Sequence, residues 1–172
     1  MEDVFLAGDG FMLVSGGQTG ADRAALDWAI EHGVRHGGWC PKGRKTEDGV
    51  LPERYRLQET PAAAYLQRTE WNVRDSDATL VFTLDDRLDG GSKRTAAFAD
   101  SLGKPWLHVR PGVHPKYVAR FLARHAVQVL NVAGKRESSA PGIGELVRQV
   151  LSQAIGRSGL PKQDISYLQY FW

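Results

Sequence analysis

A glycine-rich turn between two apolar segments is the feature that most constrains the fold of this chain. Residues 11–15 (FMLVS) favour a β-strand, and residues 21–31 have the spacing of a helix with one buried face. Residues 16–20 (GGQTG) join them, with glycine at three of the five positions. A strand that passes directly into a helix begins a βα unit, which predicts a parallel sheet covered by helices.

The same alternation continues along the rest of the chain. Further apolar, β-branched runs predict strands over residues 38–40, 79–84, 106–110 and 127–132. Helical spacing, the first instance preceded by the cap signal Thr60-Pro61, predicts helices over residues 62–74, 92–102, 114–125 and 142–154. We expect an α/β fold, a three-layer sandwich around a Rossmann-like, doubly wound, mainly parallel sheet, with the strand order 2-1-3-4-5.

The length of 172 residues fits one domain, so we expect residues 1–172 to form a single domain of this type. Two segments interrupt the alternation. Residues 41–59 are charged and show no period, which predicts a lid-like loop. Residues 157–172 form an aromatic C-terminal tail, which we expect to pack on this chain or on a second copy; its aromatic residues are Tyr167, Tyr170, Phe171 and Trp172.

Composition limits the classes of partner and compartment. The formal net charge is +2, from 22 basic and 20 acidic residues, which argues against a nucleic-acid partner. The single cysteine, Cys40, excludes an internal disulfide and suits a reducing compartment. Residues 1–3 (MED) lack the basic start of a signal peptide, and no apolar run approaches the ~20 residues that span a bilayer. We therefore expect a cytoplasmic protein without a membrane partner.

The glycine-rich turn is also a candidate anion site. The first turn of a helix carries free N–H groups and the positive end of the helix dipole, and glycine lets a ligand approach the backbone. Thr19 adds a hydroxyl donor. The turn matches neither the Walker A pattern nor G-x-G-x-x-G, so a tight strand-to-helix turn without a ligand is the alternative interpretation.

A second glycine loop follows the strand predicted over residues 79–84. Residues 89–95 (DGGSKRT) again open a helix and include two basic side chains. In the order 2-1-3 the two loops leave neighbouring strands side by side, where the ligands of open α/β sheets bind. We therefore predict a site for a phosphorylated small molecule, made by Gly16, Gly17, Gln18, Thr19, Gly20, Gly90, Gly91, Ser92, Lys93, Arg94 and Thr95.

Further side chains are candidate ligand contacts. Asn72 offers a donor and an acceptor to the edge of a purine or pterin ring, and Thr69 lies three residues before it on the same helical face. Asp22 suits a ligand hydroxyl, with stabilisation of its own helix dipole as the alternative. Lys42 in the charged segment and Arg136 after the last strand suit a phosphate, although a polar loop also explains Arg136. Histidine and cysteine residues show no metal-ligand spacing, so no metal site is predicted.

Several stretches of the sequence resemble one known family. They are SGGQTGADRAALD (15–27), GGWCPKGR (37–44), RTEWNVRDSD (68–77), and LNVAG followed by RES (130–138). They are similar to the molybdenum carrier family, a branch of the SLOG superfamily that also includes the LOG phosphoribohydrolases, often labelled lysine decarboxylases, and the DNA-processing protein DprA. The resemblance implies a Rossmann-like fold, a nucleotide or a molybdenum cofactor as the ligand, and a homodimer or higher homo-oligomer.

One departure from the LOG enzymes bears on catalysis. Those enzymes carry P-G-G-x-G-T-x-x-E with a catalytic glutamate; here Gly90 and Gly91 match the glycines, but the position of the acid falls on Ala97 or Phe98. N-glycosidic hydrolysis needs an acid or nucleophile beside the sugar. The resemblance therefore implies a carrier or sensor without catalytic residues, which holds a phosphorylated, nucleotide-like ligand. The alternative is a nucleotide N-glycosidase whose acid is Glu70, Glu137 or Asp22.

Overall fold

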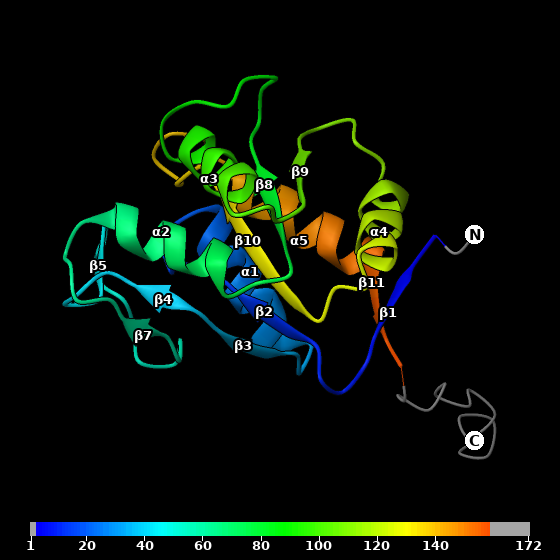
Figure 1. The fold of residues 1–172 in the computed structure, drawn as a ribbon, viewed down its shortest axis with the longest axis horizontal. Helices are drawn as coiled ribbons and strands as arrows, with labels where there is room; N and C mark the ends of the chain where they lie inside the picture. Colours follow the sequence, from blue (N-terminus) through cyan, green and yellow to red (C-terminus); the bar gives the residue numbers. More distant parts are fainter. Residues whose placement is uncertain (1–2, 159–172) are drawn as a thin grey trace, which may run out of the picture.

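A five-stranded parallel sheet forms the centre of the molecule (Figure 1). The structure, a computed structural model, describes residues 3–158 of the chain. The strands follow the spatial order β3-β2-β10-β8-β9, and every neighbouring pair is parallel. Their bounds are β2 (Met12–Val14), β3 (Arg35–Gly37), β8 (Ala78–Phe82), β9 (Trp106–Val109) and β10 (Val129–Gly134).

Helices cover both faces of this sheet, which confirms the predicted three-layer α/β sandwich (Figure 1). On one face α5 packs against α1 and α4, and on the other face α2 packs against α3. The helices are α1 (Ala21–Glu31), α2 (Tyr65–Arg74), α3 (Gly90–Ser101), α4 (Pro115–Arg124) and α5 (Ile143–Ala154).

The strand order differs from the predicted 2-1-3-4-5. β10, the last strand of the sheet in the sequence, lies between β2 and β8 and pairs with both. Its Leu130, Asn131 and Val132 are buried, as expected for a strand with neighbours on both sides. Periodicity shows that a strand is buried but not which strands flank it, so the sequence did not reveal this position. As a result, the loop after β10 lies between the loops after β2 and β8.

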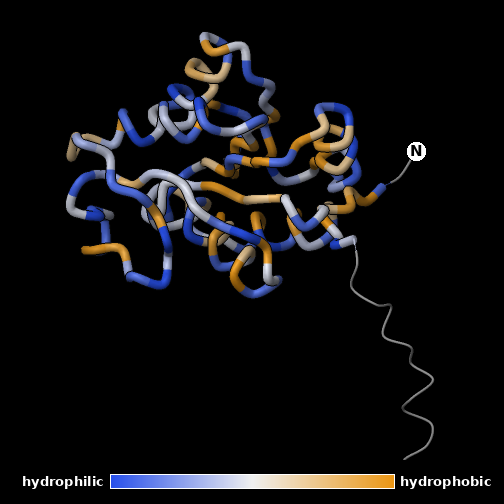
Figure 2. Tube along the Cα trace, turned by 60° about the horizontal axis from the view of Figure 1, so that its bottom comes forward, coloured by the Kyte–Doolittle hydropathy of each residue, from blue (hydrophilic) through white to orange (hydrophobic). Residues whose placement is uncertain are grey.

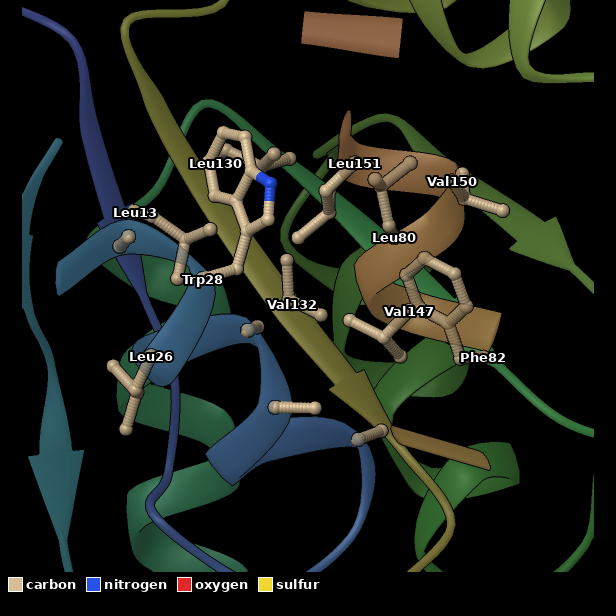
Figure 3. Close-up of a cluster of buried hydrophobic side chains, with 14 of the residues drawn as sticks. Leu13, Leu26, Trp28, Leu80, Phe82, Leu130, Val132, Val147, Val150 and Leu151 are labelled. Atoms are coloured by element: carbon tan, nitrogen blue, oxygen red, sulfur yellow. The ribbon is translucent and has the colours of Figure 1, made fainter. Parts of the chain in front are cut away.

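The two faces of the sheet differ in polarity. On the face covered by α1 and α5, Leu130 and Val132 of β10 meet apolar side chains of both helices, among them Trp28 (Figure 3). Side chains alternate along a strand, so Asn131 and Thr79 point to the other face, where Asn131 Nδ2 donates to Thr79 Oγ1 at 3.2 Å. Buried polar side chains of the sheet therefore lie beneath α2 and α3.

Two element boundaries differ from their predictions. The helix expected over residues 62–74 begins at Tyr65, because the Thr60 hydroxyl donates to the carbonyl of Ala62 at 3.0 Å and does not cap the helix. The strand expected over residues 38–40 is displaced, since Gly38 has φ +121° and turns the chain out of the sheet after β3. The next residues form β4 (Trp39–Cys40), which pairs with β7 (Gln58–Glu59) outside the main sheet.

Residues 41–59 form a packed segment beside the turn that joins β2 to α1. Leu51, Tyr55 and Leu57 are buried. The Arg44 guanidinium donates to the carbonyls of these three residues and of Pro52, at distances between 2.8 and 3.2 Å. An antiparallel hairpin completes the segment, made by β5 (Lys45–Thr46) and β6 (Gly49–Val50). The segment expected to be a lid-like loop is thus held in place by its own hydrogen bonds.

The two ends of the described chain meet in a small second sheet. It pairs β1 (Phe5–Ala7) with β11 (Ile155–Arg157) in parallel. The expected aromatic tail begins here, but the residues that make it aromatic lie outside the described residues: Tyr167, Tyr170, Phe171 and Trp172. Figure 2 shows hydrophobic residues along the strands at the centre of the molecule. Among the helices of residues 3–158, none is long and apolar enough to cross a bilayer.

Candidate ligand-binding site

A cleft of about 400 Å³ opens between α2 and α3, at the carboxyl end of β10. Residues 131–134 at the end of β10 form its floor, and α2 and the first turn of α3 form two of its walls. The β2–α1 turn forms a third wall with Gly16, Gln18 and Asp22. The other lining residues are Tyr65, Leu66, Arg68, Thr69, Asn72, Asp89, Gly90, Gly91, Ser92, Arg94, Thr95, Lys135, Arg136 and Ser139. Ligands of parallel α/β sheets bind at this edge of the sheet.

The first turn of α3 presents N–H groups and a hydroxyl to the cleft. The first N–H groups of a helix have no carbonyl partner within it, and no side chain caps α3. A side chain added at Gly90 or Gly91 would meet no atom within 4 Å, so this wall is open at both glycines. Ser92 is 2% exposed, and its Oγ has no hydrogen-bond partner within residues 3–158. Such a wall suits an anion.

A second buried donor lies on the wall that the β2–α1 turn forms. The side chain belongs to Gln18, which is 5% exposed. Its Oε1 accepts the N–H of Thr19 at 3.1 Å and the N–H of Glu47 at 2.9 Å, which fixes the orientation of the amide. Its Nε2 has no partner in the described part of the chain. A buried donor without a partner costs about 1–3 kcal/mol, so Gln18 and Ser92 both favour an acceptor in the cleft.

A buried ion pair lies beside Gln18. Arg68 Nη1 is 3.1 Å from Asp22 Oδ2, and the two side chains are 11% and 8% exposed. The same Oδ2 accepts the N–H of Gln18 at 3.2 Å. Burial raises the pKa of the Asp22 carboxyl, and the charge of Arg68 opposes this rise. The pair also explains Gly16, because a side chain at that position would overlap the Arg68 guanidinium.

Basic side chains outnumber acidic ones around the cleft. The lining contains two carboxylates and four basic side chains, the latter being Arg68, Arg94, Lys135 and Arg136. Lys135 pairs with the carboxylate of Asp89. Arg136 Nη1 lies 3.9 Å from Glu47 Oε2, and Arg136 Cζ is 5.7 Å from the centre of the Tyr65 ring. The excess of positive charge favours an anionic ligand.

Two glycines of the first glycine turn pack against protein atoms instead of facing the cleft. Gly17 has φ +78° and a side chain there would meet Leu51. Gly20 also has φ +78° and lies against the backbone of residues 135–137. Neither glycine lines the cleft. The packing of the protein itself therefore requires both.

The N-terminus of α1 is likewise occupied by protein groups. The Ala21 N–H donates to the carbonyl of Lys135 at 3.1 Å. The Thr19 hydroxyl donates to the Glu47 carboxylate and accepts the N–H of Glu137 at 3.2 Å. The loop after β10 thus covers this helix end, and the open helix end at the cleft is that of α3.

Two predicted contacts on α2 line the cleft but already have protein partners. Asn72 Oδ1 accepts the N–H of Trp39 at 2.8 Å, and its Nδ2 donates to the Trp39 carbonyl at 3.0 Å. The Thr69 hydroxyl donates to the carbonyl of Tyr65 at 3.0 Å. In this structure Asn72 therefore fixes the chain at β4, while Thr69 bonds within its own helix.

The structure brings most of the predicted residues together. Those that line the cleft are Gly16, Gln18, Asp22, Thr69, Asn72, Gly90, Gly91, Ser92, Arg94, Thr95 and Arg136. Those outside its lining are Gly17, Thr19, Gly20, Lys42 and Lys93. Sequence reasoning missed Tyr65, Arg68 and Asn131. The first two lie three or four residues from Thr69 or Asn72 on one face of α2, so helical spacing was a signal that could have found them.

The donors around the cleft are suited to oxyanions. Within residues 3–158, no group of three or more His, Cys, Asp or Glu side chains is arranged to hold a metal ion. Backbone N–H groups, a hydroxyl, an amide and basic side chains instead donate hydrogen bonds to anionic oxygens.

The sequence and fold are similar to those of known proteins. The family model described as "Circularly permutated YpsA SLOG family" matches residues 13–155. A crystal structure of a "putative molybdenum carrier protein" from Syntrophus aciditrophicus SB is 45% identical with a TM-score of 0.79, over 83% of this chain and 92% of that chain. A structure of (E)-4-hydroxy-3-methyl-but-2-enyl diphosphate reductase is 10% identical with a TM-score of 0.39, over 83% of this chain and 59% of that chain. No curated protein matches the chain.

Proposed function

The chain belongs to the circularly permutated YpsA SLOG family, and from this membership we propose that it is a binding protein, a carrier or sensor, for a phosphorylated, nucleotide-like small molecule. The ligand would lie in the cleft between α2 and α3. The name of the relative from Syntrophus aciditrophicus describes that protein as a carrier, which supports a binding role here.

The proposal rests on the buried Ser92 hydroxyl and its lack of a hydrogen-bond partner within residues 3–158. Ser92 lies in the uncapped first turn of α3 beside Gly90 and Gly91. Phosphate oxygens would accept hydrogen bonds from this hydroxyl and from the N–H groups of the same turn. Arg94 adds positive charge to the cleft, whereas the charge of Lys135 is paired with Asp89.

The size of the cleft favours a ligand larger than a single oxyanion. A volume of about 400 Å³ lies within the range of sites for small organic ligands. Tyr65 and Leu66 add an aromatic ring and an apolar side chain on the α2 wall, which a flat ring system would contact. A phosphate at α3 and a ring at Tyr65 together describe a nucleotide-like molecule.

A molybdenum cofactor would fit this cleft through its phosphate. The donors that line the cleft bind phosphate oxygens, and the described residues offer no cluster of metal ligands. Ser92 and the first turn of α3 would hold the phosphate of such a cofactor, and Tyr65 would contact its ring system.

For the alternative activity, N-glycosidic hydrolysis, one of the three candidate acids remains. Asp22 lines the cleft, whereas Glu70 and Glu137 do not. Burial raises the pKa of Asp22, a property shared with many general acids. Its Oδ2, however, already accepts hydrogen bonds from Arg68 and from the Gln18 backbone, an arrangement suited to a fixed acceptor. Binding without turnover is therefore the function that the geometry supports best.

Replacement of Ser92 tests the proposal. By isothermal titration calorimetry, the protein should bind adenosine 5′-monophosphate (AMP) and should bind adenosine far more weakly. Ser92→Ala removes one donor to a charged acceptor and should weaken AMP binding about tenfold or more. The hydroxyl has no partner within residues 3–158, so the variant should keep its free energy of unfolding within about 1 kcal/mol of the wild type.

Ser101→Ala is the matched control. Ser101 lies at the other end of α3, its hydroxyl donates to the Phe98 carbonyl at 3.3 Å, and it does not line the cleft. This variant should bind AMP like the wild type. The proposal fails if Ser92→Ala binds AMP as tightly as this control does, or if adenosine binds as tightly as AMP.

A further inference from the structure

β10 lies between the two strands that lead into two walls of the cleft. β2 and β8 flank β10, so their carboxyl ends are two strand spacings, or about 10 Å, apart. Gln18 and Asp22 follow β2, whereas Ser92 follows β8. Two walls that follow different strands therefore each present polar groups to the cleft, and a ligand that contacts both walls needs two polar groups.

The wall beside β2 combines a donor with an acceptor. Gln18 Nε2 is a buried donor without a partner in the described part of the chain. The Asp22 carboxylate is an acceptor close by, because its Oδ2 accepts the N–H of Gln18. A ligand group at this wall can therefore accept a hydrogen bond from Gln18 Nε2 and donate one to the Asp22 carboxylate.

A phosphate suits that wall less well than a hydroxyl does, because an ionised phosphate has only acceptor oxygens and cannot donate to the Asp22 carboxylate. Neighbouring hydroxyls do suit it, because each hydroxyl both donates and accepts. We propose that Gln18 and Asp22 bind the 2′ and 3′ hydroxyls of a ribose ring, so that the ligand is a ribonucleotide with its phosphate at Ser92. This inference rests on the proposed function, since it needs the phosphate at α3.

Arg68 is consistent with the same arrangement. Its Nη1 is 3.1 Å from Asp22 Oδ2, and its Cζ is 5.3 Å from the centre of the Tyr65 ring. One guanidinium therefore lies close to both the carboxylate and the aromatic ring. A base attached to the ribose would lie beside Tyr65 and Arg68 while the sugar hydroxyls reach Asp22.

Discrimination between sugars is the direct test. Calorimetric titration of the full chain compares AMP with 2′,3′-dideoxyadenosine 5′-monophosphate, which lacks both hydroxyls. Loss of hydrogen bonds to a charged group predicts at least about tenfold weaker binding of the dideoxy nucleotide. Guanosine 5′-monophosphate is titrated as well, to detect a preference for one base.

The outcomes separate this inference from the proposed function. Equal affinities for AMP and its dideoxy form would overturn the inference and leave the proposed function in place. A preference for one base without a preference for the sugar would assign this wall to a base edge and also overturn it. Failure of every nucleotide to bind would overturn the proposed function itself.

Replacement of the Gln18 donor locates the sugar contact. Gln18→Glu keeps an oxygen that accepts the N–H of Thr19 and of Glu47 but loses the Nε2 donor. The ratio of the affinities for AMP and for dideoxy-AMP, called the sugar difference below, should therefore fall several-fold. Gln67→Glu makes the same change outside the cleft, where Gln67 Oε1 accepts the N–H of Ala62 at 2.8 Å. This control should keep the full sugar difference.

A second variant covers the case in which Gln18→Glu does not fold. Asp22→Asn keeps the shape of the side chain but removes its charge, and should reduce the sugar difference in the same direction. Its control is Asp27→Asn, on the same helix and outside the cleft, where Asp27 accepts a hydrogen bond from the Tyr55 hydroxyl. If folded Gln18→Glu or Asp22→Asn keeps the full sugar difference, the hydroxyls are bound elsewhere and the inference is wrong.

Discussion

At the scale of single residues, the glycines around the cleft are of two kinds: some are required by close packing of the protein, and others leave open space. Gly20 has a left-handed backbone and lies against the backbone of residues 135–137, so the fold requires glycine there. Gly91 lies in the first turn of α3, where an added side chain would meet no atom within 4 Å. Space that the protein leaves unused at Gly91 is space that a ligand can use.

Alanine substitutions at these two glycines should therefore have opposite effects. Gly20→Ala should lower the free energy of unfolding by more than about 2 kcal/mol, because it combines a left-handed backbone with atomic overlap. Gly91→Ala should leave this free energy unchanged or raise it by up to about 1 kcal/mol, because alanine is the better helix former. Urea unfolding measures both changes.

Gly91→Ala should also weaken AMP binding several-fold, because its methyl group enters the cleft. A Gly91→Ala protein that is stable and binds AMP with full affinity would show that the anion does not approach this turn.

At the scale of elements, the β5–β6 hairpin joins parts of the molecule that border the cleft. Asp48 lies 2.6 Å from Arg23 Nη1 on α1 and accepts a hydrogen bond from the Thr46 hydroxyl at 2.6 Å. Glu47 accepts a hydrogen bond from the Ser138 hydroxyl at 2.6 Å, in the loop after β10. Hydrogen bonds from Ser138 and Thr19 lower the pKa of Glu47. The hairpin therefore depends on ionised carboxylates.

The hairpin should make the stability of the protein sensitive to acid. Hydrogen bonds from Arg23 and Thr46 lower the pKa of Asp48 to about 2, from an ordinary value of 3.8. A carboxyl with a lowered folded-state pKa stabilises the fold above its unfolded-state pKa, and this stabilisation is lost as the pH falls through the folded-state value. The loss from Asp48 should occur between about pH 4 and pH 2.

Asp48→Asn isolates this contribution, because other titrating groups are common to both proteins. Urea unfolding at a series of pH values should show the wild type more stable than Asp48→Asn at pH 7, with the difference shrinking toward about pH 2. A difference that does not change with pH would mean that the charge of Asp48 does not stabilise the hairpin.

At the scale of the whole molecule, the two faces of the sheet differ, because only the face beneath α2 and α3 carries the cleft. Leu130 and Val132 belong to the apolar core beneath α1 and α5 (Figure 3). Asn131 faces the opposite side and lines the cleft. The face beneath α2 and α3 also buries apolar side chains, among them Val73 and Val81, but it carries the donors and charges that line the cleft as well. This division suits the proposed carrier function, since a ligand in the cleft would not contact the apolar core beneath α1 and α5.

A carrier should bind nucleotide without consuming it. Incubation of the protein with AMP, followed by chromatography, should release no adenine above the level of a protein-free sample. Release of adenine in excess of the protein concentration, abolished in Asp22→Asn and kept in Glu70→Gln and Glu137→Gln, would establish the N-glycosidase alternative. Asp22 is the informative position because it lines the cleft and the two glutamates do not.

The sequence predicted the fold class because periodicity reports burial, and burial is shared by every sandwich of this kind. It predicted that the second glycine loop opens a helix, now seen to line the cleft, because Gly90 and Gly91 follow a strand and precede helical spacing. It did not predict the strand order, because pairing between β2 and β10 depends on contacts far apart in the sequence. For the same reason it did not show that Gly17 and Gly20 are required by Leu51 and by residues 135–137.

The central position of β10 also determines when the sheet can be completed as the chain is synthesised. The pairs β2–β3 and β8–β9 leave the ribosome before the strand that joins them. The contact between Ser15 and Val132 spans 117 residues, and contacts of such long range form late. Until β10 emerges, each pair exposes an unpaired edge open to aggregation, so a nascent chain is at its most vulnerable just before its sheet and its cleft are completed.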